Sequence, residues 1–96
     1  MESRKNHPSP NDTFASCLRR LRRRLDAKQL WLSREVGCTD AAVSRWEKGD
    51  RLPRQDTVEL FVEALKKEGA MPGEIVLLRM RWQKEALRRI LRARAA

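Results

Sequence analysis

The stretch from Gln29 to Pro53 places the strongest constraint on how this 96-residue chain can fold. Two short segments with helical spacing of apolar residues, 29–36 and 40–48, are separated there by only three residues. Gly37 follows the first segment, where a helix commonly ends in the left-handed conformation, and Thr39 precedes the second, where it can cap a helix. We therefore expect a helix, a tight turn, a second helix and a stiff exit loop.

Apolar residues at helical spacing continue on both sides of this stretch. They predict a first helix that starts near Thr13, a fourth over about 54–67 and a fifth from Pro72 to about Arg94. In the second helix Leu32 and Val36 are expected on the inner face with Leu30 beside them, and Leu60 is expected in the apolar stripe of the fourth helix. The fold class is therefore all-α, a compact bundle of four helices plus a long C-terminal fifth helix. Its expected parts are a disordered arm over 1–12, a domain over 13–69 and a C-terminal amphipathic helix over 70–96.

Charge is the strongest global feature of the composition. Lys and Arg total 22 against 13 Asp and Glu, which gives a net charge of +9. Such a basic chain is attracted to polyanions, and nucleic acid is the commonest of these. The alternative is a well-hydrated basic surface, and the run Arg19, Arg20, Arg23 and Arg24 in the first helix is expected to be such a solvated face.

Several classes of function are not supported by the sequence. The spacing of Cys17 and Cys38 fits no zinc or redox motif, so both are expected to be buried free thiols. His7 is the only histidine, and no glycine-rich phosphate loop is present. We expect no catalysis, no cofactor and no metal. No apolar run reaches the roughly 18 residues of a membrane span and no signal peptide is visible, which predicts a cytoplasmic protein.

The run GCTDAAVSRWEKGDRLP, residues 37–53, resembles the Cro/repressor-type (XRE-like) helix-turn-helix family of small bacterial or phage transcriptional regulators. The resemblance covers about residues 14–68. It rests on the turn glycine, the capping hydroxyl, the inward residues, the Glu-x-Gly and the following proline, which are Gly37, Thr39, Val43, Trp46, Glu47, Gly49 and Pro53. Lys28 and Ser33 depart from the family pattern, which more often has a hydroxyl cap and an alanine at these positions. Asp40 and Ala41 also depart from it, because they replace the longer polar residues often found at the start of the second helix of the motif.

The resemblance implies roles for individual residues. Helix 40–48 would lie in the DNA major groove, and its outward residues would contact bases: Asp40, Ala41, Ser44 and Arg45. Phosphate contacts would come from Gln29, Thr39, Lys48 and Arg51. Arg22 and Glu47 would form a structural ion pair, although two unrelated surface charges are an alternative. Asp40 has the alternative role of a carboxylate that favours the helix dipole.

The fifth helix carries more apolar surface than a four-helix core needs. We expect a dimer interface there, formed by Ile75, Leu78, Trp82, Leu87, Ile90 and Leu91, although completion of the monomer core is an alternative. The implied function is a sequence-specific regulator, most simply a repressor, that binds double-stranded DNA as a homodimer on an inverted-repeat operator. Two alternatives remain open. One is an antitoxin that also binds a partner protein, and the other is an RNA-binding or coactivator role.

Overall fold

The computed structural model describes residues 12–95, which form five helices and confirm the all-α fold class. The helices are α1 (Phe14–Arg24), α2 (Gln29–Val36), α3 (Asp40–Lys48), α4 (Gln55–Lys67) and α5 (Pro72–Ala95). The arm expected over residues 1–12 lies, apart from Asp12, outside the described residues.

Local sequence signals account for where the helices begin and end. Thr13 caps α1 in a capping box, because its Oγ1 accepts from the Ser16 amide at 3.2 Å and its own amide donates to Ser16 Oγ at 3.0 Å. Thr39 Oγ1 accepts from the Ala42 amide at 3.1 Å at the start of α3. Gly37 ends α2 with φ at 76° and Gly49 ends α3 with φ at 83°, a backbone region that favours glycine. The turn and both helix ends therefore follow the sequence prediction.

The helices enclose one hydrophobic core to which all five contribute. Phe61 of α4 packs edge-on against Trp46 of α3, with ring centroids 5.3 Å apart and an interplanar angle of 77°. The largest fully buried apolar side chains are Phe14, Phe61, Leu18, Leu32, Leu65, Leu78, Val43, Val58 and Val62. Because α3 is anchored on this core through Val43 and Trp46, its outer face has a fixed orientation.

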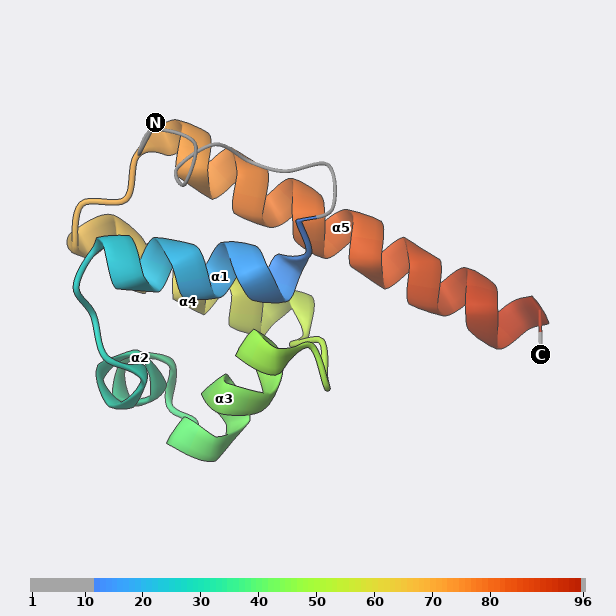
Figure 1. Ribbon diagram of the computed structural model, residues 1–96, viewed down its shortest axis with the longest axis horizontal. Coiled ribbons are helices and arrows are strands. Elements are labelled where there is room, and N and C mark those ends of the chain that lie inside the picture. Colours follow the sequence, from blue (N-terminus) through green and yellow to red (C-terminus); the bar gives the residue numbers. More distant parts are fainter. Residues whose placement is uncertain (1–11, 96) are drawn as a thin grey trace.

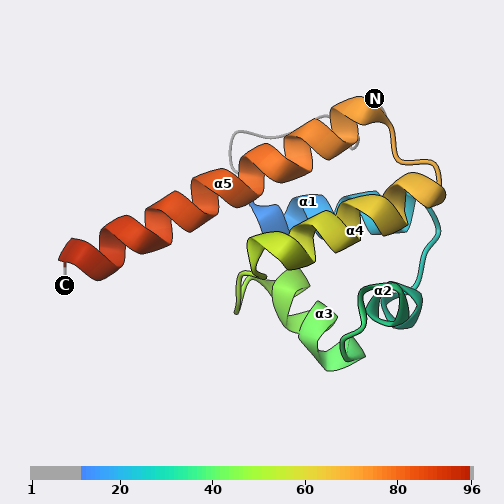
Figure 2. The same cartoon turned by 180° about the vertical axis from the view of Figure 1, so that it is seen from behind.

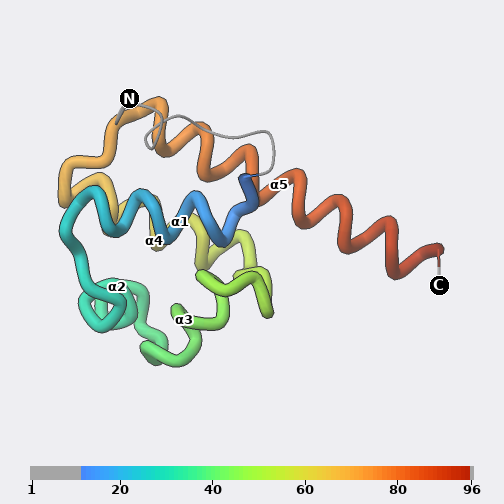
Figure 3. Tube along the Cα trace, in the orientation of Figure 1, coloured from blue at the N-terminus to red at the C-terminus, as the bar shows by residue number. Residues whose placement is uncertain are grey.

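The arrangement of the helices leaves α2 and α3 at one side of the molecule (Figures 1 and 2). α1 contacts α3 on one side and α5 on the other, and α2 contacts α3 and α4. The first half of α5 runs along α1, whereas its second half extends beyond the rest of the helices to the C-terminal end, as the trace in Figure 3 shows. The chain is therefore a compact bundle with one projecting helical segment.

The structure corrects four expectations about which apolar side chains are buried. Leu30, expected beside the inner face of α2, and Leu60, expected in the apolar stripe of α4, are 48% and 49% exposed. Ile75 and Leu78, expected at a dimer interface, are only 5% and 0% exposed because they complete the chain's own core. The hydrophobic core therefore continues past the expected domain boundary at residue 69. Spacing identified an apolar stripe on each helix but not the part of the stripe that the neighbouring helices cover.

The arginine run of α1 is not simply a solvated face. Arg24 forms an ion pair with Glu74 at the start of α5, and Arg20 forms one with Asp12 at 2.8 Å.

Cys17 is buried, Cys38 is half-buried, and both are free thiols. Burial raises the pKa of both thiols, which disfavours the reactive thiolate. Among the described residues, no helix is both long enough and apolar enough to cross a membrane.

Candidate nucleic-acid interface

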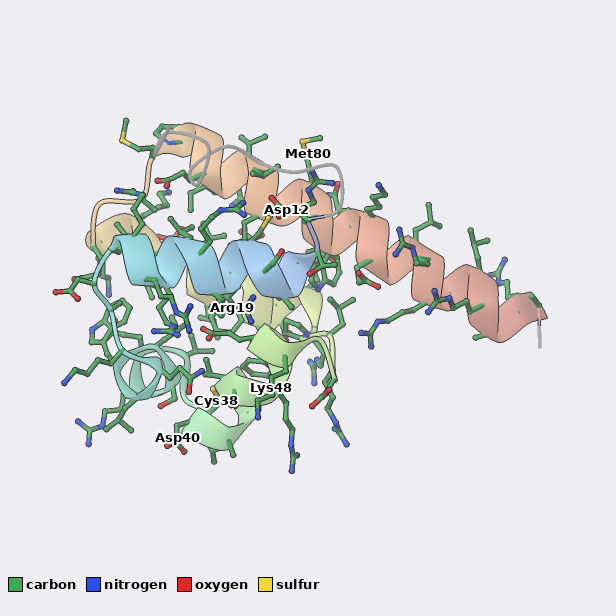
Figure 4. All side chains as sticks on the ribbon, viewed as in Figure 1. Asp12, Arg19, Cys38, Asp40, Lys48 and Met80 are labelled. Atoms are coloured by element: carbon green, nitrogen blue, oxygen red, sulfur yellow. The ribbon has the colours of Figure 1, made fainter. Side chains whose placement is uncertain are left out.

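The outer face of α3 carries the side chains expected to contact DNA bases. At about 100° per residue, positions 40, 41, 44, 45 and 48 fall within an arc of about 140° on one side of the helix. Asp40, Ala41, Arg45 and Lys48 are exposed and Ser44 is half-buried. Figure 4 shows Asp40 at the outer edge of the molecule, at the first residue of α3. The structure thus brings the expected base-contacting residues together on one accessible surface.

The inner face of α3 is held by a buried ion pair between Glu47 and Arg22 of α1. Arg22 Nε donates to Glu47 Oε2 at 2.6 Å, and Arg22 Nη2 donates to Glu47 Oε1 at 2.9 Å. Only 10% of the Arg22 side chain and 2% of the Glu47 side chain are exposed. The hydrogen bonds to Glu47 hold the pKa of the Arg22 guanidinium above its ordinary value, although burial opposes this. A paired, planar contact of this kind fixes orientation as well as distance.

Two further side chains join this pair, and the sequence did not indicate either contact. Arg19 Nη1 donates to the Glu47 backbone carbonyl at 3.2 Å, and Gln29 Nε2 donates to Glu47 Oε1 at 3.0 Å. The only available signal for Arg19 was its position one helical turn before Arg22, on the same side of α1. Glu47 is therefore the point where α1, α2 and α3 are joined.

The residues expected to contact phosphates surround the face of α3. Thr39 is exposed at its start, and Lys48 and Arg51 are exposed at its end and in the exit loop. Gln29 is half-buried, and its amide nitrogen keeps a second N–H beyond the one given to Glu47. The Thr39 hydroxyl accepts from Ala42 and can still donate its own proton. These four side chains therefore retain hydrogen-bond donors for an anion.

The departures from the family pattern at Lys28 and Ser33 each have a structural consequence. Lys28 makes no side-chain cap, so α2 begins without the hydrogen bond that a hydroxyl would supply. Ser33 is 2% exposed, and its hydroxyl donates to the Leu30 carbonyl at 2.7 Å. Serine is therefore accommodated at this close-packed position because its polar atom is satisfied within its own helix.

α5 supports the exit loop with its first half and leaves its second half exposed. Trp82 Nε1 donates to the Pro53 carbonyl at 2.7 Å, which ties α5 to the loop that follows α3. Beyond Trp82, the apolar side chains of Leu87, Ile90 and Leu91 are 57%, 51% and 57% exposed. Of the six residues expected at a dimer interface, these three are the ones that the structure leaves open to a partner. The described residues contain no cluster of His, Cys, Asp or Glu suited to a metal ion.

The comparison with protein families decides the classification. The family described as "Helix-turn-helix domain" matches residues 13–71, which is more than half of the chain. The chain belongs to this helix-turn-helix family. The match confirms the resemblance given by residues 37–53, and it supports a DNA-binding regulator, because a helix-turn-helix domain presents its second helix to the major groove. No curated protein and no solved structure matches the chain.

Proposed function

We propose that this helix-turn-helix protein is a sequence-specific transcriptional regulator, a repressor that binds an inverted-repeat operator as a homodimer with α3 in the major groove. The observation that supports this most directly is the α3 surface. Its outward residues are accessible, while its inward residues are locked to α1 and α2 through Glu47. Because the helix is fixed before DNA arrives, little ordering cost accompanies binding.

In this proposal, Arg45 is the principal base reader. Its exposed guanidinium can donate two parallel hydrogen bonds to O6 and N7 of a guanine. Ser44 can bond to several base edges, Ala41 can contact a thymine methyl group, and Asp40 can accept from a cytosine amino group. Gln29, Thr39, Lys48 and Arg51 would set the register through phosphates, which carry no sequence information themselves.

A base-reading surface of this size covers only a few base pairs, so selectivity requires a second copy. The exposed stripe of Leu87, Ile90 and Leu91 on the projecting half of α5 supplies an apolar surface for that contact. Two-fold symmetry would then place two α3 helices about 34 Å apart, one turn of DNA. A regulator of this kind acts on the chromosome, so the proposal places the protein in the cytoplasm.

Selection of bound duplexes from random DNA tests the proposal with a single measurement. The expected result is an enriched inverted repeat with half-site centres separated by about one helical turn, 10–10.5 base pairs. Enrichment of a single short half-site would contradict the homodimer. Equal recovery of all sequences would contradict base-specific recognition.

The same exposed stripe favours one alternative, an antitoxin that binds DNA through α3 and a partner protein through α5. A stripe of three half-exposed aliphatic side chains fits a groove on another protein as well as a second copy of itself. Sedimentation of the purified chain separates the two. A dimer at micromolar concentration favours the homodimer, whereas a monomer favours a different partner on the stripe.

A further inference from the structure

The projecting half of α5 has a cationic face that is distinct from its apolar stripe. Arg88 and Arg89 each lie three or four residues from both Glu85 and Arg92, so all four share one side of the helix. Leu87, Ile90 and Leu91 point to the opposite side by the same helical period. The centres of the two faces therefore point in different directions, although Arg88 and Arg92 border the stripe, where they line a hollow with Leu87 and Leu91.

This cationic face lies across a hollow from the end of α3 and the exit loop. The hollow has a volume of about 270 Å³, and its lining includes Lys48 and Arg51 on one side and Arg88, Arg89 and Arg92 on the other. Arg89 Nη2 donates to the Gly49 carbonyl at 3.4 Å, which brings the two sides into contact. Five cationic side chains from segments about 40 residues apart thus surround one space.

The positive charge of the hollow is poorly balanced. Among the described residues of the lining, Glu85 is the only carboxylate, and it lies 3.9 Å from Arg89. Within residues 12–95, the structure gives Lys48, Arg51, Arg88 and Arg92 no ion pair with a carboxylate. Like charges held this close repel one another, so an anion that enters the hollow gains from several of them at once.

The chemistry of the lining favours phosphate, and its position favours a phosphate of DNA. Arginine presents planar N–H pairs that match phosphate oxygens, and four of the five cations are arginines. All five cationic side chains are exposed, so a passing strand can reach them. Lys48 belongs both to the hollow and to the outer face of α3, which makes the hollow continuous with the base-reading surface.

We propose that this hollow binds the sugar–phosphate backbone beside the half-site, so that Arg88, Arg89 and Arg92 of α5 extend the DNA contact beyond the helix-turn-helix unit. The inference rests on the proposed function. It assigns α5 a direct part in DNA affinity, in addition to the partner surface on its opposite side. Base discrimination stays with α3, because phosphate contacts are independent of sequence.

The test measures the salt dependence of binding for the full chain, with duplexes that end at the half-sites and duplexes extended on both sides. Arg88→Ala/Arg92→Ala removes two cations from the hollow. The matched control, Lys66→Ala/Lys67→Ala, removes two exposed cations from the far end of α4. On extended duplexes the slope of log affinity against log salt should fall in magnitude by about 3.6 for the α5 variant, because a homodimer loses two cations from each protomer, at about 0.9 for each phosphate. The slope should change much less for the control variant. On the short duplexes, the difference in slope between the α5 variant and the wild type should be smaller.

Each outcome has a defined meaning. Equal slopes for the α5 variant and the wild type, in a wild type that binds DNA, overturn this inference and leave the proposed function standing. A wild type that binds no duplex overturns both. Binding of pyrophosphate or a nucleoside triphosphate, measured without DNA, distinguishes a soluble phosphate ligand from the DNA backbone. Binding of these probes that depends on Arg88 and Arg92, with an unchanged DNA slope, assigns the hollow to a soluble ligand and also overturns the inference.

Discussion

At the scale of single residues, the proposed function assigns most of the sequence discrimination to Arg45. Its guanidinium is exposed on α3 and can read a guanine through two parallel hydrogen bonds. Arg45→Lys keeps the charge but loses the paired geometry. We expect this variant to retain most of its affinity for random DNA while losing about 1–3 kcal/mol of preference at one base position in each half-site. Binding titrations against the selected site and its single-base variants measure the effect.

Arg45→Ala provides the second measurement for the same residue. It removes the charge as well, so random DNA should also bind more weakly, but specific binding should fall further. Lys48→Ala is the matched control, because it should weaken binding to all sequences alike. An equal loss on specific and random DNA for both variants would show that Arg45 contacts phosphate and not bases.

The buried pair of Arg22 and Glu47 leads to a prediction about stability. Glu47→Leu leaves the Arg22 guanidinium buried without its carboxylate, which should cost about 3–5 kcal/mol in the free energy of unfolding. Arg22→Met/Glu47→Leu removes both charges and should recover most of that loss, since uncharged side chains carry no desolvation penalty. Urea unfolding of the wild type and both variants provides the values. A double variant no more stable than Glu47→Leu would contradict this account of the site.

The residues around Glu47 show what the sequence could and could not predict about the site. The family pattern identified Glu47 and its partner Arg22, because both recur at fixed positions within that pattern. Arg19, one turn before Arg22 on α1, and Gln29, on α2, also bind Glu47, and the family pattern indicated neither contact. Contacts of this kind depend on how three helices pack in space, and local periodicity contains no information about that packing.

At the scale of elements, the first turn of α5 is attached to α1 through Glu74. The Glu74 carboxylate accepts from the Arg24 guanidinium and, at 2.8 Å, from the Met71 amide. Burial raises the pKa of Glu74, but these hydrogen bonds outweigh it and hold the pKa below its ordinary value of 4.5. A carboxylate whose pKa is lower in the folded state stabilises the fold when the pH is above its ordinary, unfolded-state pKa. That stabilisation is lost as the pH falls through the folded-state pKa.

Glu74→Gln should therefore lower the free energy of unfolding at neutral pH, and the difference from wild type should shrink as pH falls below about 4.5. Chemical unfolding measured from pH 3 to pH 7, a range of about four units that includes the ordinary carboxylate pKa, tests the direction of this pH dependence. Glu68→Gln, which removes the same charge from an exposed neighbouring residue, is the control. A difference between wild type and Glu74→Gln that stays constant to the lowest pH would contradict the role of the ionised carboxylate.

The helices themselves were largely predictable, whereas their buried faces were not. Thr13, Gly37, Thr39 and Gly49 marked four helix ends, because capping is a local interaction. α5 shows the limit of such patterns. Its apolar residues continue around the helix, and only packing against α1 decides that Leu78 is buried while Met80 points away from the bundle (Figure 4).

The exposed stripe of α5 gives a prediction at the same scale. Leu87→Glu places a charge in the proposed dimer interface and should convert the dimer to a monomer without loss of helical content. Leu60→Glu is the matched control, because Leu60 is 49% exposed on α4, away from the stripe. Analytical ultracentrifugation at equal concentrations compares the two variants. Identical sedimentation of Leu87→Glu and the control would exclude this stripe as the interface.

At the scale of the whole molecule, the boundary of the family match and the boundary of the hydrophobic core do not coincide. The match ends at residue 71, but Ile75 and Leu78 beyond it lie in the core and Trp82 packs against it. The apolar side chains after Trp82 leave the core. The folding unit should therefore end near residue 83, inside α5, and not at the start of that helix.

Two truncated chains test this boundary. A chain that ends at Met71 loses Ile75, Leu78 and Trp82, and each large buried side chain removed costs about 2–5 kcal/mol. The sum approaches the whole stability of a small domain, about 5–15 kcal/mol, so this chain should be largely unfolded. A chain that ends at Gln83 keeps these contacts and the bond from Trp82 to Pro53, and it should unfold cooperatively as a monomer. Circular dichroism and sedimentation distinguish the two chains. A stable, cooperatively folded chain ending at Met71 would show that α5 is an appendage and not the last element of the core.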